Sequence, residues 1–194
     1  MTNNDEHYIN QISMGDTNAF AVLVDRYKDL VFTLALRMLK NRDEAEEVAQ
    51  DTFVKVYRSL KRFKGDSKFS TWVYRITYNT CLDRIKKNKN FNSNYSVDEF
   101  TDLQLKSIDN ALDNLDLKER QKTIQNCIDH LDEEDSFLIT LYYYDDLSME
   151  EIGKTVNLTA NNVKVKLFRI RKKLASILRQ HLEPEVIEYY ERER

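Results

Sequence analysis

The sequence predicts an all-α protein: two small helical domains joined by a flexible acidic linker, the second domain containing a helix-turn-helix. Three observations support this prediction. The 194 residues include only three Gly and one Pro, too few turn residues for a sheet protein with many tight turns. Apolar residues recur every three or four positions through most of the chain, as in amphipathic helices. One stretch, 89–118, is rich in Asn, Ser and Asp and loses this periodicity.

Three helices are predicted for the first domain, residues 1–88. The first runs from about Asp16 to Lys40. The second runs from about 42 to 62 and begins with the capping-box pair Asn41 and Glu44. The third begins after Ser70, a suitable N-cap, and reaches about residue 87. A basic loop that contains Gly65 separates the second and third helices.

The second domain is predicted to span residues 119–183, with an acidic tail at 184–194. The linker before it, 89–118, includes one short helix near 103–112. Helices are expected at 119–131 and 133–144. Ser148 and Glu151 form a capping box that opens a short helix ending near Val156. After a brief turn, Thr159 caps a long helix that reaches about residue 182, just before the stop signal Pro184. A short helix, a tight turn and a longer basic helix together make a helix-turn-helix layout.

Charge is distributed unevenly along the chain, although the net charge is only −3. Residues 55–89 contain eleven basic and two acidic side chains, a net charge of +9, and residues 159–182 contain seven basic and no acidic ones, a net charge of +7. The stretch between these blocks is acidic. Two such basic blocks predict two surfaces that bind polyanions. The alternative is two solvated helix faces.

The last long helix has an apolar inner stripe and a polar outer face. The stripe consists of Val163, Leu167, Ile170, Leu174, Ile177 and Leu178. Asn161, Val165, Phe168, Arg169 and Lys172 lie on the opposite side. Asn pairs with adenine, Arg and Lys pair with guanine, and further basic residues contact phosphates, so this face suits the major groove of DNA. Phe168 either meets a thymine methyl group or packs against a neighbouring helix.

Four ordered motifs carry a family resemblance. The first motif begins with Gly15-Asp16 and Ala19-Phe20, and the second is Asp43–Phe53 (DEAEEVAQDTF). The third is Phe69–Ile76 (FSTWVYRI), and the fourth is Leu147–Leu174. Over about residues 8–182 the chain resembles the extracytoplasmic function (ECF) sigma factors, the smallest group of the sigma-70 family. Gly153 departs from the family's usual Ala, Ile170 replaces a small residue, and the tail has no counterpart.

The resemblance implies an alternative sigma factor that binds core RNA polymerase and directs promoter recognition, promoter melting and transcription initiation. It implies three sets of site residues. Those for the minus-35 element are Asn161, Asn162, Lys164, Val165, Lys166, Phe168, Arg169, Lys172 and Lys173. Those for the minus-10 element are Lys61, Arg62, Phe63, Lys64, Lys68, Phe69, Thr71, Trp72, Arg75, Asn79 and Arg84. Those for core polymerase are Glu44, Glu47, Gln50, Asp51, Phe53 and Tyr57.

Several of these residues have a second interpretation. Trp72 and Phe53 also fit core positions at helical spacing, and Asn79 also fits a hydrogen bond between helices. The carboxylates of the second helix also fit a solvated face. The implied partners are core RNA polymerase, promoter DNA and an anti-sigma factor.

Other classes of protein fit the sequence less well. No nucleophile–base pair, phosphate-binding loop or metal-ligand spacing is visible, which argues against an enzyme and predicts no cofactor. Two Cys without a partner pattern suit a reducing cytoplasm. The sequence has no signal-peptide pattern and no apolar run long enough for a membrane span, so no membrane contact is expected. A helix-turn-helix transcriptional repressor is the alternative, but it leaves the basic block at 55–89 unexplained.

Overall fold

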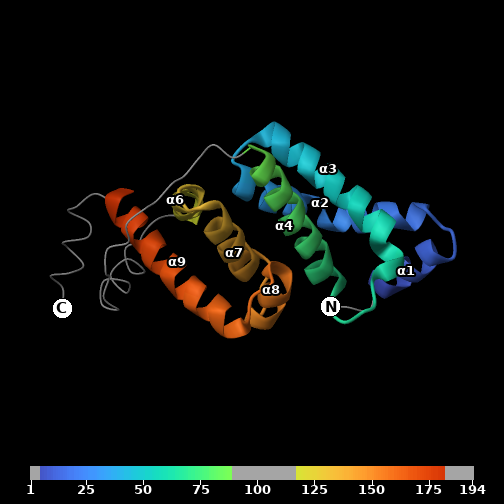
Figure 1. The fold of residues 1–194 in the computed structure, drawn as a ribbon. Helices are drawn as coiled ribbons and strands as arrows, with labels where there is room; N and C mark the ends of the chain where they lie inside the picture. Colours follow the sequence, from blue (N-terminus) through green and yellow to red (C-terminus); the bar gives the residue numbers. More distant parts are fainter. Residues whose placement is uncertain (1–4, 89–116, 182–194) are drawn as a thin grey trace. The chain divides into compact units, whose positions relative to one another are not determined.

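The computed structural model describes residues 5–88 and 117–181, and every regular element within these two ranges is a helix (Figure 1). The prediction of an all-α fold is therefore confirmed. The predicted short helix at 103–112, nearly all of the predicted linker and the tail after His181 lie outside the described residues. The elements are α1 (Asp5–Ser13), α2 (Asn18–Leu39), α3 (Arg42–Ser59), the 3-10 helix η1 (Leu60–Arg62), α4 (Phe69–Asn88), α6 (Leu117–Asp129), α7 (Glu133–Tyr144), α8 (Met149–Val156) and α9 (Ala160–His181).

The chain divides into two compact units. The first consists of residues 1–90 and 140–163, and the second of residues 91–139 and 164–194. Helices α7 and α9 each contribute residues to both units. None of the helices within the described ranges is long and apolar enough to cross a membrane.

The first unit is built around helices α2, α3 and α4, which contact one another pairwise. Their apolar faces meet in a core that contains Leu23, Val31 and Leu34 of α2, Val48 of α3 and Val73 of α4, all nearly or completely buried. Burying such side chains contributes about 1.5–3 kcal/mol each. Helix α8 also lies against α4 in this unit (Figure 1).

Two N-terminal helix signals had different outcomes. Asn41 caps α3 as predicted, since its side chain accepts a hydrogen bond from the Glu44 amide at 3.1 Å. The prediction of Ser70 as the N-cap of the next helix is wrong. Helix α4 already begins at Phe69, and the Trp72 amide donates to the Lys68 carbonyl at 3.2 Å. Phe69 is buried, and burial of its ring favours its place in the first turn of α4.

Helix α1 is an element that the sequence patterns did not predict. None of its residues is fully buried, and Tyr8, Ile9 and Ile12 are half-buried. Asp5 ties it to α2, because its carboxylate pairs with Arg26 and accepts a hydrogen bond from the Tyr27 hydroxyl at 2.6 Å. These long-range polar contacts add to the packing of α1 against α2.

The second unit has its own apolar cluster. Cys127, Ala175 and Leu178 are buried together, and Ile124, Leu174 and Ile177 pack against them. The inner stripe predicted for the last helix is thus buried or half-buried throughout. Burial raises the pKa of the Cys127 thiol to about 11 and that of Cys81 to about 12, so both thiols stay protonated at neutral pH and behave as small apolar side chains.

Candidate nucleic-acid and polymerase interfaces

Local hydrogen bonds fix both the start of α8 and the turn that joins α8 to α9. Ser148 and Glu151 form the predicted capping box, with the Ser148 amide donating to the Glu151 carboxylate at 2.9 Å. Asn157 ends α8 in the left-handed conformation with φ of 59°. Thr159 then accepts a hydrogen bond from the Asn162 amide and caps α9. The predicted helix-turn-helix is therefore present.

Gly153 explains how the turn can be so short. Its carbonyl accepts the Leu158 amide at 2.9 Å. A Cβ atom at this position would lie 2.5 Å from the Leu158 carbonyl oxygen. Gly thus stands where the backbone of the turn passes too close for a side chain.

The outer face of α9 is exposed as the pattern predicted. Asn161, Asn162, Lys164 and Arg169 are all open to solvent. Val165 and Phe168 are 43% and 48% exposed. The Lys172 ammonium lies over the Phe168 ring, 4.9 Å from its centre. An aromatic ring beside a cation on an exposed helix face can contact a thymine methyl group and a phosphate together.

Two basic side chains of α9 are instead engaged within the protein. Lys173 binds Asp132 at 2.7 Å and Asp135 at 2.6 Å, and Lys166 binds Glu134 at 3.0 Å. Burial disfavours the charged ammonium, but the two aspartates outweigh this and raise the pKa of Lys173. Both lysines thus connect α9 to the N-terminal end of α7, a role that local sequence patterns do not reveal because the two helices are far apart in sequence.

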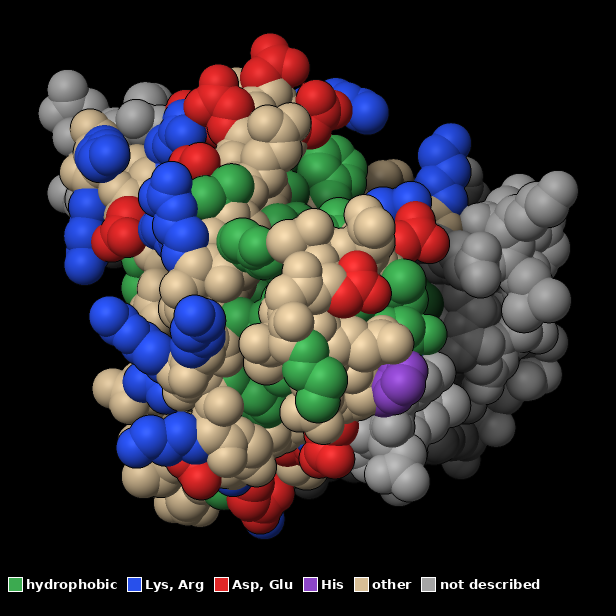
Figure 2. All heavy atoms as spheres, turned by 90° about the vertical axis from the view of Figure 1, so that its right-hand side faces the viewer, with side chains coloured by type: hydrophobic (Ala, Val, Ile, Leu, Met, Phe, Trp, Pro, Cys, Tyr) green, Lys and Arg blue, Asp and Glu red, His purple; other side chains and the backbone are tan. Residues whose placement is uncertain are grey.

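The basic loop predicted at 61–69 consists of the end of η1 and the segment that joins η1 to α4, and its exposed side chains include Lys61, Arg62 and Lys64. Gly65 turns the chain with φ of +78°. The space-filling view shows Lys and Arg side chains along one side of a face on which hydrophobic side chains also reach the surface (Figure 2). Positive charge beside apolar surface suits the binding of a single strand with unstacked bases.

An aromatic cluster anchors this loop. Phe63 contacts Phe69 and Trp72, with ring centres 5.4 and 5.2 Å apart, and Phe69 also contacts Tyr27 at 5.7 Å. Phe69 is only 4% exposed and Thr71 only 2%. In this conformation these two residues pack inside the helix bundle, whereas Phe63 and Trp72 are half-buried and present part of their rings to solvent.

The remaining residues predicted for the minus-10 element lie along α4. Arg75 and Asn79 are exposed. Arg84 pairs with Glu47 of α3 at 2.8 Å, so residues predicted for two different partners are joined. A shallow hollow of about 360 Å³ lies between the two helices there, lined among others by Asp51, Lys55 and Arg84.

The surface predicted to meet core polymerase lies on α3. Glu47, Gln50 and Asp51 are exposed, whereas Glu44 and Phe53 are half-buried. Tyr57 is 42% exposed and packs edge-on against Phe20 at 5.0 Å. This surface therefore combines carboxylates of α3 with an aromatic pair, Tyr57 of α3 and Phe20 of α2, near the C-terminal end of α3.

The fold and these surfaces define a helical DNA-binding protein with a helix-turn-helix and a separate basic, aromatic loop. Residues 23–91 match the profile of Sigma-70 region 2, and residues 121–174 match that of Sigma-70, region 4. The chain is 38% identical over 183 residues to the ECF RNA polymerase sigma factor SigW of Bacillus subtilis, covering 88% of this chain and 95% of that protein. It is 30% identical over 183 residues to the RNA polymerase sigma-H factor of Pseudomonas aeruginosa, covering 90% and 93%.

Two solved structures share the fold. One is CnrH in complex with the cytosolic domain of CnrY, with a TM-score of 0.63, 23% identity and coverage of 91% of this chain and 97% of that chain. The other is the sigma factor RpoE in complex with the anti-sigma factor NepR from Bartonella quintana, with a TM-score of 0.60, 18% identity and coverage of 82% and 96%. The chain belongs to the ECF sigma factors of the sigma-70 family. It is an alternative sigma factor that directs transcription initiation by RNA polymerase, and nothing in these similarities supports the repressor alternative.

Proposed function

We propose that three surfaces of this chain divide the work of initiation. The outer face of α9 reads the minus-35 element in the major groove, with Asn161, Asn162 and Arg169 toward base edges and Lys164 and Lys172 toward phosphates. The exposure of Val165 and Phe168 beside these polar groups supports this role. Lys166 and Lys173 position the helix through their carboxylate partners on α7.

The basic loop and α4 hold the minus-10 element. Lys61, Arg62 and Lys64 supply positive charge for the phosphates of the DNA backbone. Phe63 and Trp72 offer ring surface to an unstacked base. Arg75 and Asn79 extend the same exposed surface along α4. Phe69 and Thr71 support the loop from inside the bundle, because both are buried.

Core polymerase binds the exposed face of α3. Glu44, Glu47, Gln50 and Asp51 offer polar contacts, and Phe53 and Tyr57 offer apolar ones. The ion pair between Arg84 and Glu47 supports a polymerase surface that lies beside the DNA surface. This adjacency suits a protein that must present opened DNA to the enzyme that copies it.

The chain itself supplies no catalytic step and acts in the cytoplasm. Its minus-10 domain spans residues 1–88 and its minus-35 domain spans 119–183. An anti-sigma factor is a further partner, by analogy with the complexes in which RpoE of Bartonella quintana binds NepR and CnrH binds the cytosolic domain of CnrY.

Reconstitution with bacterial core polymerase tests this function. The full chain and core enzyme, given genomic DNA, should start transcripts at a small set of sites that share two upstream sequence elements. Sequencing of the transcript 5′ ends measures this. Random start sites, or the same start sites from core enzyme alone, would show that the chain does not select promoters.

A paired substitution tests the minus-10 surface. Replacing Arg62 and Lys64 by Ala should lower permanganate reactivity of the minus-10 bases about tenfold while core binding stays unchanged, since both side chains lie off α3. Lys28→Ala is the matched control, because Lys28 is also exposed and basic but lies on α2, outside both proposed surfaces. Equal reactivity in both variants would count against the assignment.

A further inference from the structure

Tyr27 of α2 connects α1 to the aromatic cluster under the basic loop. At one end its hydroxyl donates to the carboxylate of Asp5, the first residue of α1, at 2.6 Å. At the other end its ring packs edge-on against Phe69, with ring centres 5.7 Å apart. Tyr27 is only 8% exposed. One buried side chain therefore contacts both the N-terminal helix and the first residue of α4.

Phe69 lies at the centre of the aromatic cluster. Its ring contacts Phe63 at 5.4 Å and Trp72 at 5.7 Å, and those two rings contact each other at 5.2 Å. Phe69 is buried, whereas Phe63 and Trp72 are half-buried and are the rings proposed above to receive an unstacked base. Closely packed side chains transmit displacements to one another, so the positions of both rings depend on that of Phe69 and, through it, on that of Tyr27.

Asp5 fixes the orientation of Tyr27. The Asp5 side chain is 13% exposed, and each of its carboxylate oxygens has a partner: one accepts a hydrogen bond from the Tyr27 hydroxyl and the other pairs with Arg26. The Arg26 guanidinium also lies over the Tyr8 ring of α1, 5.6 Å from its centre. Burial and the hydrogen bond to Asp5 raise the pKa of Tyr27, so its hydroxyl remains a donor at neutral pH.

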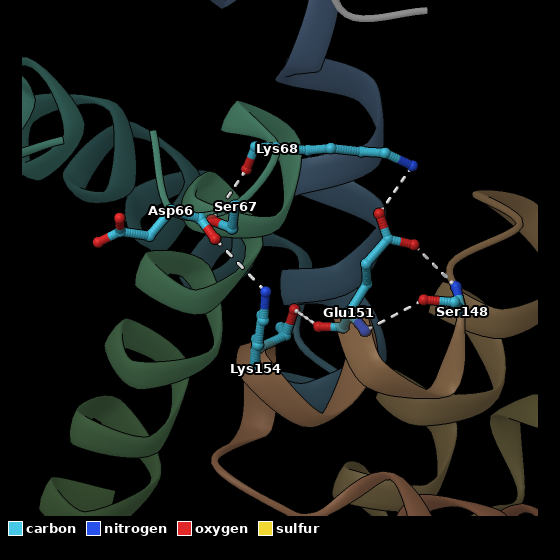
Figure 3. Close-up of polar contacts among 7 residues, drawn as sticks. Asp66, Ser67, Lys68, Ser148, Glu151 and Lys154 are labelled. Atoms are coloured by element: carbon cyan, nitrogen blue, oxygen red, sulfur yellow. Dashed lines mark hydrogen bonds and ion pairs between the residues drawn. The ribbon is translucent and has the colours of Figure 1, made fainter. Parts of the chain in front are cut away.

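The polar contact of the basic loop is separate from this series of ring contacts. The Lys68 ammonium pairs with the Glu151 carboxylate at 2.7 Å (Figure 3). This ion pair holds a charged side chain of the loop, whereas Tyr27 contacts a ring. Substitutions at Asp5 or Tyr27 therefore change the ring contact and leave both members of the ion pair in place.

We infer that Asp5 is a positioning residue for promoter melting. Through Tyr27 and Phe69 it holds the rings of Phe63 and Trp72 in the orientation that receives an unstacked minus-10 base. This inference rests on the proposed function. The competing explanation is that Asp5 only holds α1 against α2, in which case its loss lowers stability without moving the rings.

Tyr27→Phe tests the hydrogen bond, because it removes the hydroxyl and keeps the ring against Phe69. Tyr8→Phe is the matched control, since Tyr8 is a half-buried tyrosine of α1 whose ring lies under Arg26. With core polymerase and promoter DNA, permanganate reactivity of the minus-10 bases should fall about three- to tenfold in Tyr27→Phe, the range expected for one hydrogen bond. Binding of core polymerase should stay unchanged, because Tyr27 lies on α2 and not on α3. Equal reactivity in the two variants would overturn the inference.

Trp72 reports the position of the rings directly, because it is the only Trp in the chain. In the full chain without polymerase, well below its melting temperature, the Trp72 emission of Tyr27→Phe should shift to longer wavelength and its quenching by acrylamide should increase. Both should stay at the wild-type level in Tyr8→Phe. A lower melting temperature of Tyr27→Phe with unchanged quenching and unchanged permanganate reactivity would show a structural role only and would overturn the inference.

Asp5→Ala and Asp5→Asn separate the hydrogen bond from the ion pair with Arg26. The Asn amide oxygen still accepts a hydrogen bond but carries no charge, whereas Ala offers no acceptor. Asp5→Ala should lose permanganate reactivity as Tyr27→Phe does, and Asp5→Asn should retain most of it. Glu6→Ala, at the exposed neighbouring residue, is the control and should match wild type. Equal losses in Asp5→Ala and Asp5→Asn would overturn the route through Tyr27.

Failure of this inference is distinguishable from failure of the proposed function. If the wild-type chain starts no promoter-specific transcripts with core polymerase, the function is wrong, whatever the fluorescence of Trp72 shows. If it starts them and Tyr27→Phe matches Tyr8→Phe in permanganate reactivity and in quenching, the function stands and Asp5 has no part in positioning the rings.

Discussion

Among single residues, Gly153 is a position where helix propensity favours Ala but packing favours Gly. Ala is favoured over Gly in a helix by about 1 kcal/mol, but a Cβ here would lie 2.5 Å from the Leu158 carbonyl oxygen. Overpacking against backbone costs about 1–3 kcal/mol. We therefore expect Gly153→Ala to lower the melting temperature, measured by circular dichroism on the full chain.

Glu150→Ala is the control for this substitution. It lies on the same helix and is exposed, so its effect should stay within about 0.5 kcal/mol. An unchanged or higher melting temperature for Gly153→Ala would show that the turn relaxes to admit a methyl group.

Asp145 makes stability depend on pH. Burial raises the pKa of this carboxyl above its usual value, against an opposing effect of the Tyr74 hydrogen bond. A raised pKa means that the folded chain holds the proton more tightly than the unfolded chain, so this stabilisation is present at low pH and is lost as pH rises through the folded-state pKa. Asp145→Asn should remove it, so the variant gains stability relative to wild type as pH rises from about 4.

Melting temperatures of both proteins from pH 4 to 7 measure this difference. Asp146→Asn is the matched control, since Asp146 is exposed and has a positive φ of 47° that Asn also tolerates. The Asp146→Asn variant should run parallel to wild type over this range. A parallel curve for Asp145→Asn would contradict the assignment.

Among the helices, α9 combines the proposed DNA-reading face with a face whose lysines bind carboxylates at the start of α7. Lys173 is 22% exposed and binds two carboxylates of the second unit. Lys173→Gln leaves those carboxylates without their ammonium, so we expect a loss of about 1–2 kcal/mol in stability with promoter choice unchanged. Arg169→Ala should leave stability unchanged, because Arg169 is exposed. It should reduce promoter selectivity, because a base contact is worth about 1–3 kcal/mol of discrimination.

Melting temperature and start-site sequencing on both variants separate the two roles. Loss of promoter selectivity in Lys173→Gln without loss of stability would place Lys173 on the DNA instead. An unchanged promoter choice in Arg169→Ala would contradict the proposed reading face.

At the scale of the whole molecule, the proposed function assigns two DNA surfaces to separate promoter elements. Substitutions that share no partner and contact separate parts of the DNA add in free energy. Lys64→Ala and Arg169→Ala together should therefore weaken holoenzyme binding to promoter DNA by the product of their single effects, measured by titration at fixed salt. A combined effect well below that product would mean that one surface depends on the other.

Much of the fold could be predicted from local patterns. The apolar stripes of α2, α3 and α9 and the caps Asn41, Ser148 and Thr159 act within a few residues of themselves, so a single sequence displays them. Helix α1 was not predicted. The polar contacts of Asp5 with Arg26 and Tyr27, which tie it to α2, join residues that are far apart in the sequence. The start of α4 was misplaced because burial of Phe69 outweighs a capping preference at Ser70.

The sequence by itself determined the all-α class, the helix-turn-helix and the two basic blocks, since periodicity, capping and charge are local properties. Only the tertiary structure decided which basic residues face outward. Lys173 and Lys166 are bound by α7, Arg84 by Glu47 and Lys68 by Glu151, and each partner lies more than thirty residues away in the chain. Charge pairing across such separations depends on how helices pack, which no local pattern records.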